Sequence, residues 1–315
     1  MNQPGFELDV LAEPETLAAM LDAYAAADSP ARGVALSEAP RVVMIGMGSS
    51  CFAAQTAATL MRSRCIDAYV ELASVATPTP PSPETLAIGI SASGTTVETV
   101  EALARHHGVS RTMAITNYPE RVIADHAERT LPLLAGIERG GVSCKSFQTT
   151  LALLRVLAGD AIDHLRAAPE AAAALRDGRN GWLDGLLGHL AGAAPIYTIA
   201  PVERISSALE SALMFREGPR IAADGTETGD WLHVDVYLSK HPGYRALLFA
   251  GSRYDPGVMR WATERASTIV AVGAPVTGAA LSIDYPHSND PAVASLVETM
   301  VAELAASELW KRQSV

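Results

Sequence analysis

The sequence is poor in cysteine and in long apolar runs, and each shortage excludes a class of protein. Its 315 residues include three cysteines, Cys51, Cys65 and Cys144, and no C-x-x-C pair. An odd count without such a pair is typical of reduced thiols, not of a disulfide framework. No apolar run approaches the roughly 20 residues of a membrane-spanning helix, and the start of the chain lacks the features of a signal peptide. We therefore expect a cytoplasmic protein with no membrane partner.

Clusters of basic residues are lacking as well. Lys and Arg number 24 against 35 Asp and Glu, a net charge of −11, and the longest basic cluster is the pair Lys311–Arg312. A surface that neutralises a nucleic-acid backbone needs clustered Lys and Arg. We therefore expect no nucleic-acid partner. The histidines show no metal-ligand spacing, and we expect neither a metal nor a cofactor.

The sequence does contain a series of short apolar runs that lead into Ala-rich amphipathic stretches. Runs of this kind are typical of buried parallel strands followed by helices. Their alternation predicts an α/β fold built from right-handed βαβ units. The predicted strands cover residues 41–46, 68–72, 86–91 and 112–116 in the first half, and 195–200, 245–250 and 268–272 in the second.

The strand pattern repeats along the chain. The first, third and fourth strands recur in the same order at offsets of 154, 160 and 157 residues, measured between Gly46 and Ala200, Ile90 and Ala250, and Ile115 and Val272. A steady offset favours a duplicated α/β domain over the alternative of one large sheet. A helix is predicted over 13–27, and breaks between helices near Pro169 and Gly178. The predicted domains are an N-terminal helical segment 1–34, a first domain 35–165, linker helices 166–188 and a second domain 189–315.

Two predicted strand ends are rich in hydroxyl groups and glycine. Gly46-Met-Gly-Ser-Ser50 follows the first strand, and Ser91-Ala-Ser-Gly-Thr-Thr96 follows the third; each opens a helix. The N-terminus of a helix presents unpaired amides and a partial positive charge, which suit a phosphate. The alternative is that these residues only cap their helices, but one hydroxyl is enough for a cap. The two loops therefore predict a phosphate site.

Nucleotide-binding motifs match these loops less well. A nucleotide P-loop is excluded because no Gly-Lys-Ser/Thr follows. A dinucleotide site remains a second alternative, since Gly46-x-Gly48 follows a strand and Glu71 ends the next one. However, Cys51 stands where the dinucleotide motif has its third glycine. A dinucleotide site would also leave the loop Ser91–Thr96 without a function. A further loop, residues 140–146, brings a hydroxyl and a cation, Ser143 and Lys145, toward a ligand.

Taken together, the motifs resemble those of tandem sugar isomerase (SIS) domain proteins, in particular the isomerase half of glucosamine-6-phosphate synthase and stand-alone amino-sugar-phosphate isomerases and deaminases. The resemblance covers about residues 39–304. It implies two flavodoxin-like domains, each a five-stranded parallel sheet sandwiched by helices. The matching motifs are Gly46-x-Gly-Ser-Ser50, Ser91-x-Ser-Gly-Thr-Thr96, Val142-Ser-x-Lys-x-Phe147 and Leu209-Glu-x-Ala-Leu-x-x-x-Glu217.

The resemblance also implies a sugar phosphate as substrate and aldose–ketose isomerisation as the reaction. Glu217 would move the proton between C1 and C2, and His233, 16 residues later, would open the sugar ring. In the family this histidine comes from a neighbouring subunit, which implies a homodimer with a shared active site. The residues that would contact the substrate are Gly48, Ser49, Ser50, Ser91, Ser93, Gly94, Thr96, Ser143 and Lys145.

Glu217 and His233 can also be assessed from the sequence without the family resemblance. Glu203, Glu210 and Glu217 are spaced seven apart, which is usually a solvated helix face. Glu217 differs because Gly218-Pro219 end its helix, where the negative end of the helix dipole would raise its pKa. His233 lies in an alternating segment, 231–237, that is typical of a strand, where a lone histidine is more often structural.

Several departures from the family limit what the resemblance implies. No glutaminase domain is found in the sequence, so we expect no glutaminase activity. Met214 replaces a family lysine, and the family's lysine-bearing C-terminal tail has no counterpart. Ala200-Pro-Val202 replaces the glycines of the second domain, so phosphate binding is expected in the first half only. The alternatives to an isomerase are an amino-sugar-phosphate deaminase, a fructosamine-phosphate deglycase and a non-catalytic sugar-phosphate sensor.

Overall fold

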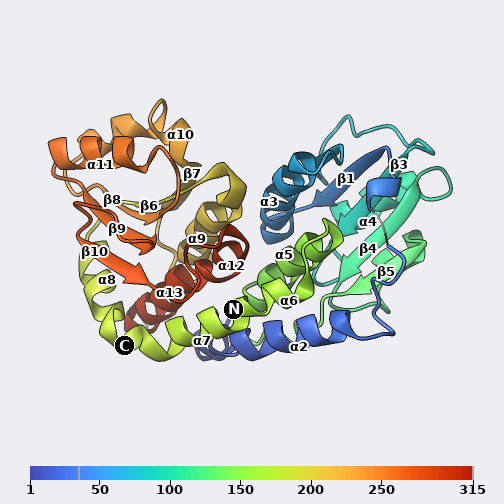
Figure 1. Ribbon diagram of the computed structural model, residues 1–315, viewed down its shortest axis with the longest axis horizontal. Helices are drawn as coiled ribbons and strands as arrows, with labels where there is room; N and C mark the ends of the chain where they lie inside the picture. Colours follow the sequence, from blue (N-terminus) through green and yellow to red (C-terminus); the bar gives the residue numbers. More distant parts are fainter. Residues whose placement is uncertain (35, 314–315) are drawn as a thin grey trace. The chain divides into compact units, whose positions relative to one another are not determined.

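The computed structural model describes residues 1–34 and 36–313, and two five-stranded parallel sheets form its framework (Figure 1). The strand order of the first sheet is β2-β1-β3-β4-β5. Its strands are β1 (Arg41–Gly46), β2 (Ala68–Leu72), β3 (Thr85–Ile90), β4 (Arg111–Thr116) and β5 (Arg129–Pro132).

The second sheet repeats the first. Read from its other edge, the strand order is β7-β6-β8-β9-β10. If these five strands are numbered from β6 as the first, the order is 2-1-3-4-5, which is the order of the first sheet. This confirms the predicted duplication, and the alternative of one large sheet is wrong. The strands are β6 (Ile196–Ala200), β7 (Ala223–Glu227), β8 (Arg245–Phe249), β9 (Thr268–Gly273) and β10 (Leu281–Asp284).

Helices flank both sheets and account for the apolar strands, which are buried on both faces. All six residues of β3 are buried, for example. The helices are α1 (Gln3–Leu11), α2 (Glu13–Ala25), α3 (Ser49–Ser63), α4 (Val97–His106), α5 (Lys145–Leu157), α6 (Ile162–Leu165), α7 (Ala167–Gly178), α8 (Leu183–Leu190), α9 (Ile205–Glu217), α10 (Thr228–Trp231), α11 (Asp255–Glu264), α12 (Pro291–Val297) and α13 (Thr299–Gln313). None of the described helices is long and apolar enough to cross a membrane.

The first predicted helix break is confirmed to within a few residues, because α6 ends at Leu165 and α7 begins at Ala167. Pro169 lies in the first turn of α7. Proline is tolerated there because the amide it lacks would have no acceptor within the helix. The second predicted break is confirmed, since α7 ends at Gly178.

The chain divides into two compact units. Residues 15–137 and 145–166 form the unit of the first sheet, the amino-terminal unit. Residues 1–14, 138–144 and 167–315 form the unit of the second sheet, the carboxy-terminal unit. The N-terminal helical segment thus contributes to both units. The domain boundaries given above stay a prediction.

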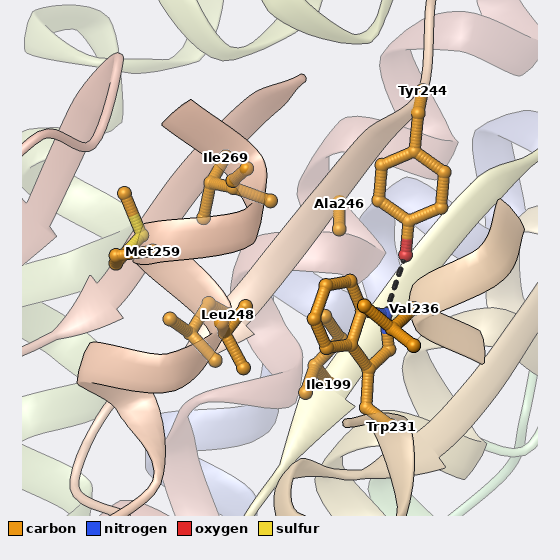
Figure 2. Close-up of a cluster of buried hydrophobic side chains, with 10 residues drawn as sticks. Ile199, Trp231, Val236, Tyr244, Ala246, Leu248, Met259 and Ile269 are labelled. Carbon is orange, nitrogen blue, oxygen red and sulfur yellow. Dashed lines mark hydrogen bonds between the residues drawn. The ribbon is translucent and has the colours of Figure 1, made fainter. Parts of the chain in front are cut away.

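An aromatic cluster forms part of the core of the carboxy-terminal unit (Figure 2). Trp231 is fully buried, and its indole Nε1 donates a hydrogen bond to the hydroxyl of Tyr244 at 2.8 Å. Tyr244 in turn stacks on Tyr197 with ring centroids 4.6 Å apart. This contact fixes α10 against the sheet and therefore fixes the start of the segment that carries His233.

Two buried glutamates meet in the same unit. Glu13 begins α2, Glu303 lies in α13, and each is about 1% exposed. Burial is the leading cause that raises the pKa of Glu13 well above its usual value and the pKa of Glu303 to about 7, and the Glu138 carboxyl contributes to both shifts. Asp9 and the thiol of Cys144 belong to the same group of interacting side chains. The pair is therefore most stable with protons bound.

We predict that stability falls as the pH rises through this pair. When folding raises the pKa of an acid, the folded protein binds more protons than the unfolded chain at any pH between the two pKa values. The stability contributed by this pair is therefore lost as the pH rises from the unfolded pKa of 4.5 to the folded pKa of about 7. Glu303→Gln is expected to flatten that fall and to gain at least about 1 kcal/mol at pH 8. Urea unfolding of the wild type and the variant at pH 5 and pH 8 measures the change in the free energy of unfolding. Glu308→Gln, on the same helix, is the control. An equal loss of stability at both pH values would contradict the prediction.

Candidate functional site

The site begins where the strand order of the first sheet reverses. The chain passes from β1 to β2 on one side and resumes with β3 on the other, so the loops after β1 and β3 leave in opposite directions. Doubly wound sheets bind ligands at such a switch point. Gly46 lets the two strand ends approach closely, because a Cβ there would lie 3.1 Å from Ser50 Cβ and 3.3 Å from the Ile90 carbonyl oxygen.

Both helices that start at this edge lack a side-chain cap. Gly48, with φ of 52°, precedes α3, and Thr96 precedes α4; neither helix has a capping hydrogen bond from its N-cap side chain. The alternative that Thr96 caps α4 is therefore wrong. Two helix N-termini with amides available for an anion lie side by side at the ends of paired strands.

The hydroxyl groups of the second loop bond to one another. Ser91 Oγ lies 2.9 Å from Thr96 Oγ1 and 3.4 Å from Ser93 Oγ, and Thr95 Oγ1 donates to Ser93 Oγ at 3.1 Å. Ser91 is 2% exposed, while Ser93 and Thr95 are exposed. We name residues 91–96 the hydroxyl loop. It presents a row of hydroxyls from the protein interior to the surface.

Gly94 holds the hydroxyl loop in shape. Its φ is +69°, and a Cβ would lie 2.7 Å from Arg121 Cβ and 2.9 Å from Thr116 Oγ1. The loop is also fixed by the 3-10 helix that follows β4 (Val122–His126), because the Ile123 amide donates to the Gly94 carbonyl at 3.2 Å. A side chain at this position would displace both the loop and Arg121.

Arg121 is the residue at this site that the sequence reasoning missed. It follows β4, and its side chain is about half exposed, stacking over Tyr118 at 5.6 Å and meeting Glu120 at 3.6 Å. The Cβ and Cγ of Arg121 pack against Gly94 of the hydroxyl loop. Its place follows from the sheet order, because β4 is the neighbour of β3 and the loops after the two strands lie at the same edge.

The other predicted contact residues have varied surroundings. Ser49 and Ser50 begin α3 half-buried, and Gly48 is exposed. Lys145 begins α5, is 6% exposed, and donates from Nζ to the Ile137 carbonyl at 2.7 Å. Ser143 is half-buried and belongs to the carboxy-terminal unit. The structure therefore brings together the residues of the loops after β1 and β3, whereas Ser143 lies in a different unit.

Glu217 ends α9 as predicted, with Gly218 as the C-cap packed against Trp310 of α13. The Glu217 side chain is partly buried, and burial raises its pKa while Arg216 lowers it. The direction agrees with the sequence reasoning, but burial is the leading cause. The expectation that Glu210 lies on a solvated face is wrong, because this residue is fully buried.

His233 is exposed and follows α10; the strand expected over 231–237 is wrong. The Glu227 carboxylate accepts the Asp230 amide at 2.8 Å and starts a helical turn instead. The His233 amide donates to the Asp230 carbonyl at 2.9 Å. Among the described residues no hydrogen bond or ion pair joins His233 to Glu217. In the same range, no group of three or more His, Cys, Asp or Glu side chains is arranged to hold a metal.

The corresponding loop of the second sheet is closed to anions. The Asp255 carboxylate accepts the amides of Gly251 and Ser252 at 2.7 and 3.1 Å. The Arg204 guanidinium donates to the Ala250 carbonyl at 2.7 Å. A side chain of the protein thus occupies the amides that a phosphate would need, which supports the expectation of one phosphate site.

Residues 35–159 match the family model of the SIS domain. This part of the chain contains an SIS domain. A glutamine–fructose-6-phosphate aminotransferase (isomerizing) of Zymomonas mobilis subsp. mobilis is 30% identical over 224 residues, which are 64% of this chain and 36% of that protein. The chain spans between 28% and 36% of the length of the first curated relatives it matches. The family that the motifs predict is confirmed.

Solved structures share the fold along nearly the whole chain. The C-terminal domain of a glucosamine-fructose-6-phosphate aminotransferase from Francisella tularensis has a TM-score of 0.82 at 17% identity, covering 98% of this chain and 96% of that one. A tagatose-6-phosphate ketose/aldose isomerase from Escherichia coli has a TM-score of 0.84 at 17% identity, with coverage of 98% and 93%. A glucosamine-6-phosphate deaminase from Thermotoga maritima has a TM-score of 0.76 at 18% identity, with coverage of 99% and 95%. The predicted fold class, two SIS-like α/β sandwiches, is confirmed.

We predict that Gly94→Ala destabilises this SIS protein more than Gly108→Ala does. Both glycines have positive φ, +69° and +77°, but only Gly94 has neighbours within 4 Å of an added Cβ. The backbone strain alone costs about 1 kcal/mol at either position, and the clash with Arg121 adds to it. Thermal unfolding of the two variants measures the difference. Equal losses would show that the hydroxyl loop is not held closely against Arg121.

Proposed function

We propose that this protein is a phosphosugar isomerase that interconverts the aldose and ketose forms of a hexose or amino-sugar phosphate. The observation that carries the proposal is the pair of uncapped helix N-termini, those of α3 and α4, at the switch point of the first sheet. The hydroxyl loop supplies donors to the phosphate oxygens, and Arg121, whose Cβ packs against Gly94, supplies a positive charge. The SIS domain supports the same class of ligand.

In the proposed reaction Glu217 takes a proton from one of the carbons C1 and C2 and returns it to the other. A carboxylate of raised pKa suits this role, because a proton shuttle works best when its pKa lies near the working pH. His233 assists ring opening. His233 is exposed on its own unit, and a side chain that enters the active site of a second copy has to be exposed. The proposal therefore includes a homodimer with a shared active site.

The proposal needs no metal and no cofactor, since enolisation requires only an acid–base group beside a polarised carbonyl. We place the protein in the cytoplasm. Its three cysteines are free and one of them, Cys65, is exposed, which suits a reducing compartment. Glutaminase activity is not part of the proposed function.

We predict that Ser93→Ala weakens the binding of fructose 6-phosphate by about tenfold or more, the value of one hydrogen bond to a charged group. Ser93 is exposed in the hydroxyl loop. Isothermal titration calorimetry measures the affinity. Ser63→Ala, which removes an exposed serine hydroxyl at the end of α3, serves as the matched control. Unchanged affinity in Ser93→Ala would place the phosphate elsewhere.

We predict that Glu217→Gln lowers kcat for isomerisation by about 10²-fold or more and leaves sugar-phosphate binding intact. The matched control is Glu264→Gln, which also ends a helix in the same unit but is exposed. Because burial raises the pKa of Glu217, wild-type kcat is expected to fall as the pH drops through that raised value. A kcat unchanged in Glu217→Gln would remove this residue from the reaction.

The same assays separate the proposal from its alternatives. Isomerisation of fructose 6-phosphate without ammonia release is the expected result. Ammonia released from glucosamine 6-phosphate would instead indicate a deaminase, the activity named for the Thermotoga maritima structure. Binding of sugar phosphates without any turnover would indicate a sensor.

A further inference from the structure

The carboxy-terminal unit has a cavity of its own at the switch point of its sheet. The chain passes from β6 to β7 on one side and resumes with β8 on the other. A cavity of about 630 Å³ lies at the ends of these three strands, lined by residues 201–204, Glu227, residues 251–254 and Pro291. This is the place where doubly wound sheets bind ligands, yet Asp255 blocks the amides that a phosphate would need.

A buried arginine contributes to this cavity. Arg204 is 5% exposed; its Nε donates to Glu298 Oε1 at 2.9 Å and its Nη2 to the Ala250 carbonyl at 2.7 Å. Its remaining nitrogen, Nη1, has no hydrogen-bond partner within the described part of the chain.

Gly251 keeps that nitrogen uncovered. The residue has φ of +131°, and a Cβ built on it would lie 3.3 Å from Arg204 Nη1. Gly251 and Arg204 both line the cavity. The guanidinium group of a largely buried arginine, reached past a glycine, therefore supplies an N–H donor at this cavity.

The rest of the lining selects against a second anion. The carboxylates of Glu203 and Glu227 and the guanidinium groups of Arg204 and Arg253 balance in charge. Behind them Glu298 pairs with Arg204, and Asp255 adds a further acidic group. Tyr254 offers an aromatic ring, with Arg253 stacked on it at 4.7 Å. Proline and valine side chains supply apolar surface.

We propose that this cavity binds an unphosphorylated monosaccharide and prefers an amino sugar to a neutral one. Arg204 Nη1 donates to a sugar oxygen, and Tyr254 packs against the ring of the sugar. The carboxylates of Glu203 and Glu227 accept hydrogen bonds from hydroxyl groups and, more strongly, from an ammonium group. The site lies in a different unit from the hydroxyl loop and does not depend on the proposed reaction.

The test is a titration of the full chain with D-glucosamine and D-glucose, followed by saturation-transfer NMR at a pH that keeps the amine protonated. We expect both sugars to bind, glucosamine more tightly. Tyr254→Ala should weaken both by about fivefold, the loss of one aromatic contact. Glu203→Gln should remove the preference for glucosamine without affecting folding, because Glu203 is exposed. Glu264→Gln, an exposed glutamate that does not line the cavity, is the matched control.

Two results would overturn the proposal. One is that neither sugar binds. The other is that both sugars bind but are weakened by Ser93→Ala and not by Tyr254→Ala or Glu203→Gln, which would place them at the hydroxyl loop. Fructose 6-phosphate titrated in parallel keeps the two proposals apart: if it fails to bind, the proposed function fails, and the result for the unphosphorylated sugars stands by itself.

Discussion

The helix N-termini at the edge of the first sheet are the constraint on which the rest of the account depends. Parallel strands β1 and β3 end level with each other, and each leads directly into a helix. The first amides of such helices cannot bond within the helix, and here no N-cap side chain satisfies them. An acidic protein, with a net charge of −11, can therefore still attract a phosphate locally, because the dipoles of two helices act over a short range.

The two units show how one fold can give two kinds of site. Both have the same strand order, and both have a loop with glycine after the third strand. In the amino-terminal unit the loop side chains are small hydroxyls. In the carboxy-terminal unit Asp255 satisfies the loop amides and Arg204 its carbonyl. The loop amides that would attract a phosphate are thus already bound by a carboxylate of the protein. The cavity beside them is lined by both acidic and basic side chains.

The sequence predicted the central strands and one edge strand, β2, closely, and it missed the other three edge strands. Strands β1, β3 and β4 form continuous apolar runs because helices cover both faces of the sheet. The missed strands β5, β7 and β10 lie toward the edges and are only partly buried; β7 reads Ala-Asp-Gly-Thr-Glu. The His233 segment was misread because Leu232, Val234 and Val236 alternate with polar residues in the sequence, whereas in the structure Val234 is exposed and Val236 is buried in a helical turn. Arg121 reaches the site through a tertiary contact with Gly94, whereas Asp255 binds amides three and four residues before it.

The most direct test of the central claim is an amide NMR titration of the isotope-labelled protein with fructose 6-phosphate. Binding at the hydroxyl loop predicts shifts concentrated on the amides of residues 48–50 and 92–98, with those of 251–255 unchanged because Asp255 already occupies two of them. Shifts at 251–255 with none at 92–98 would contradict the account.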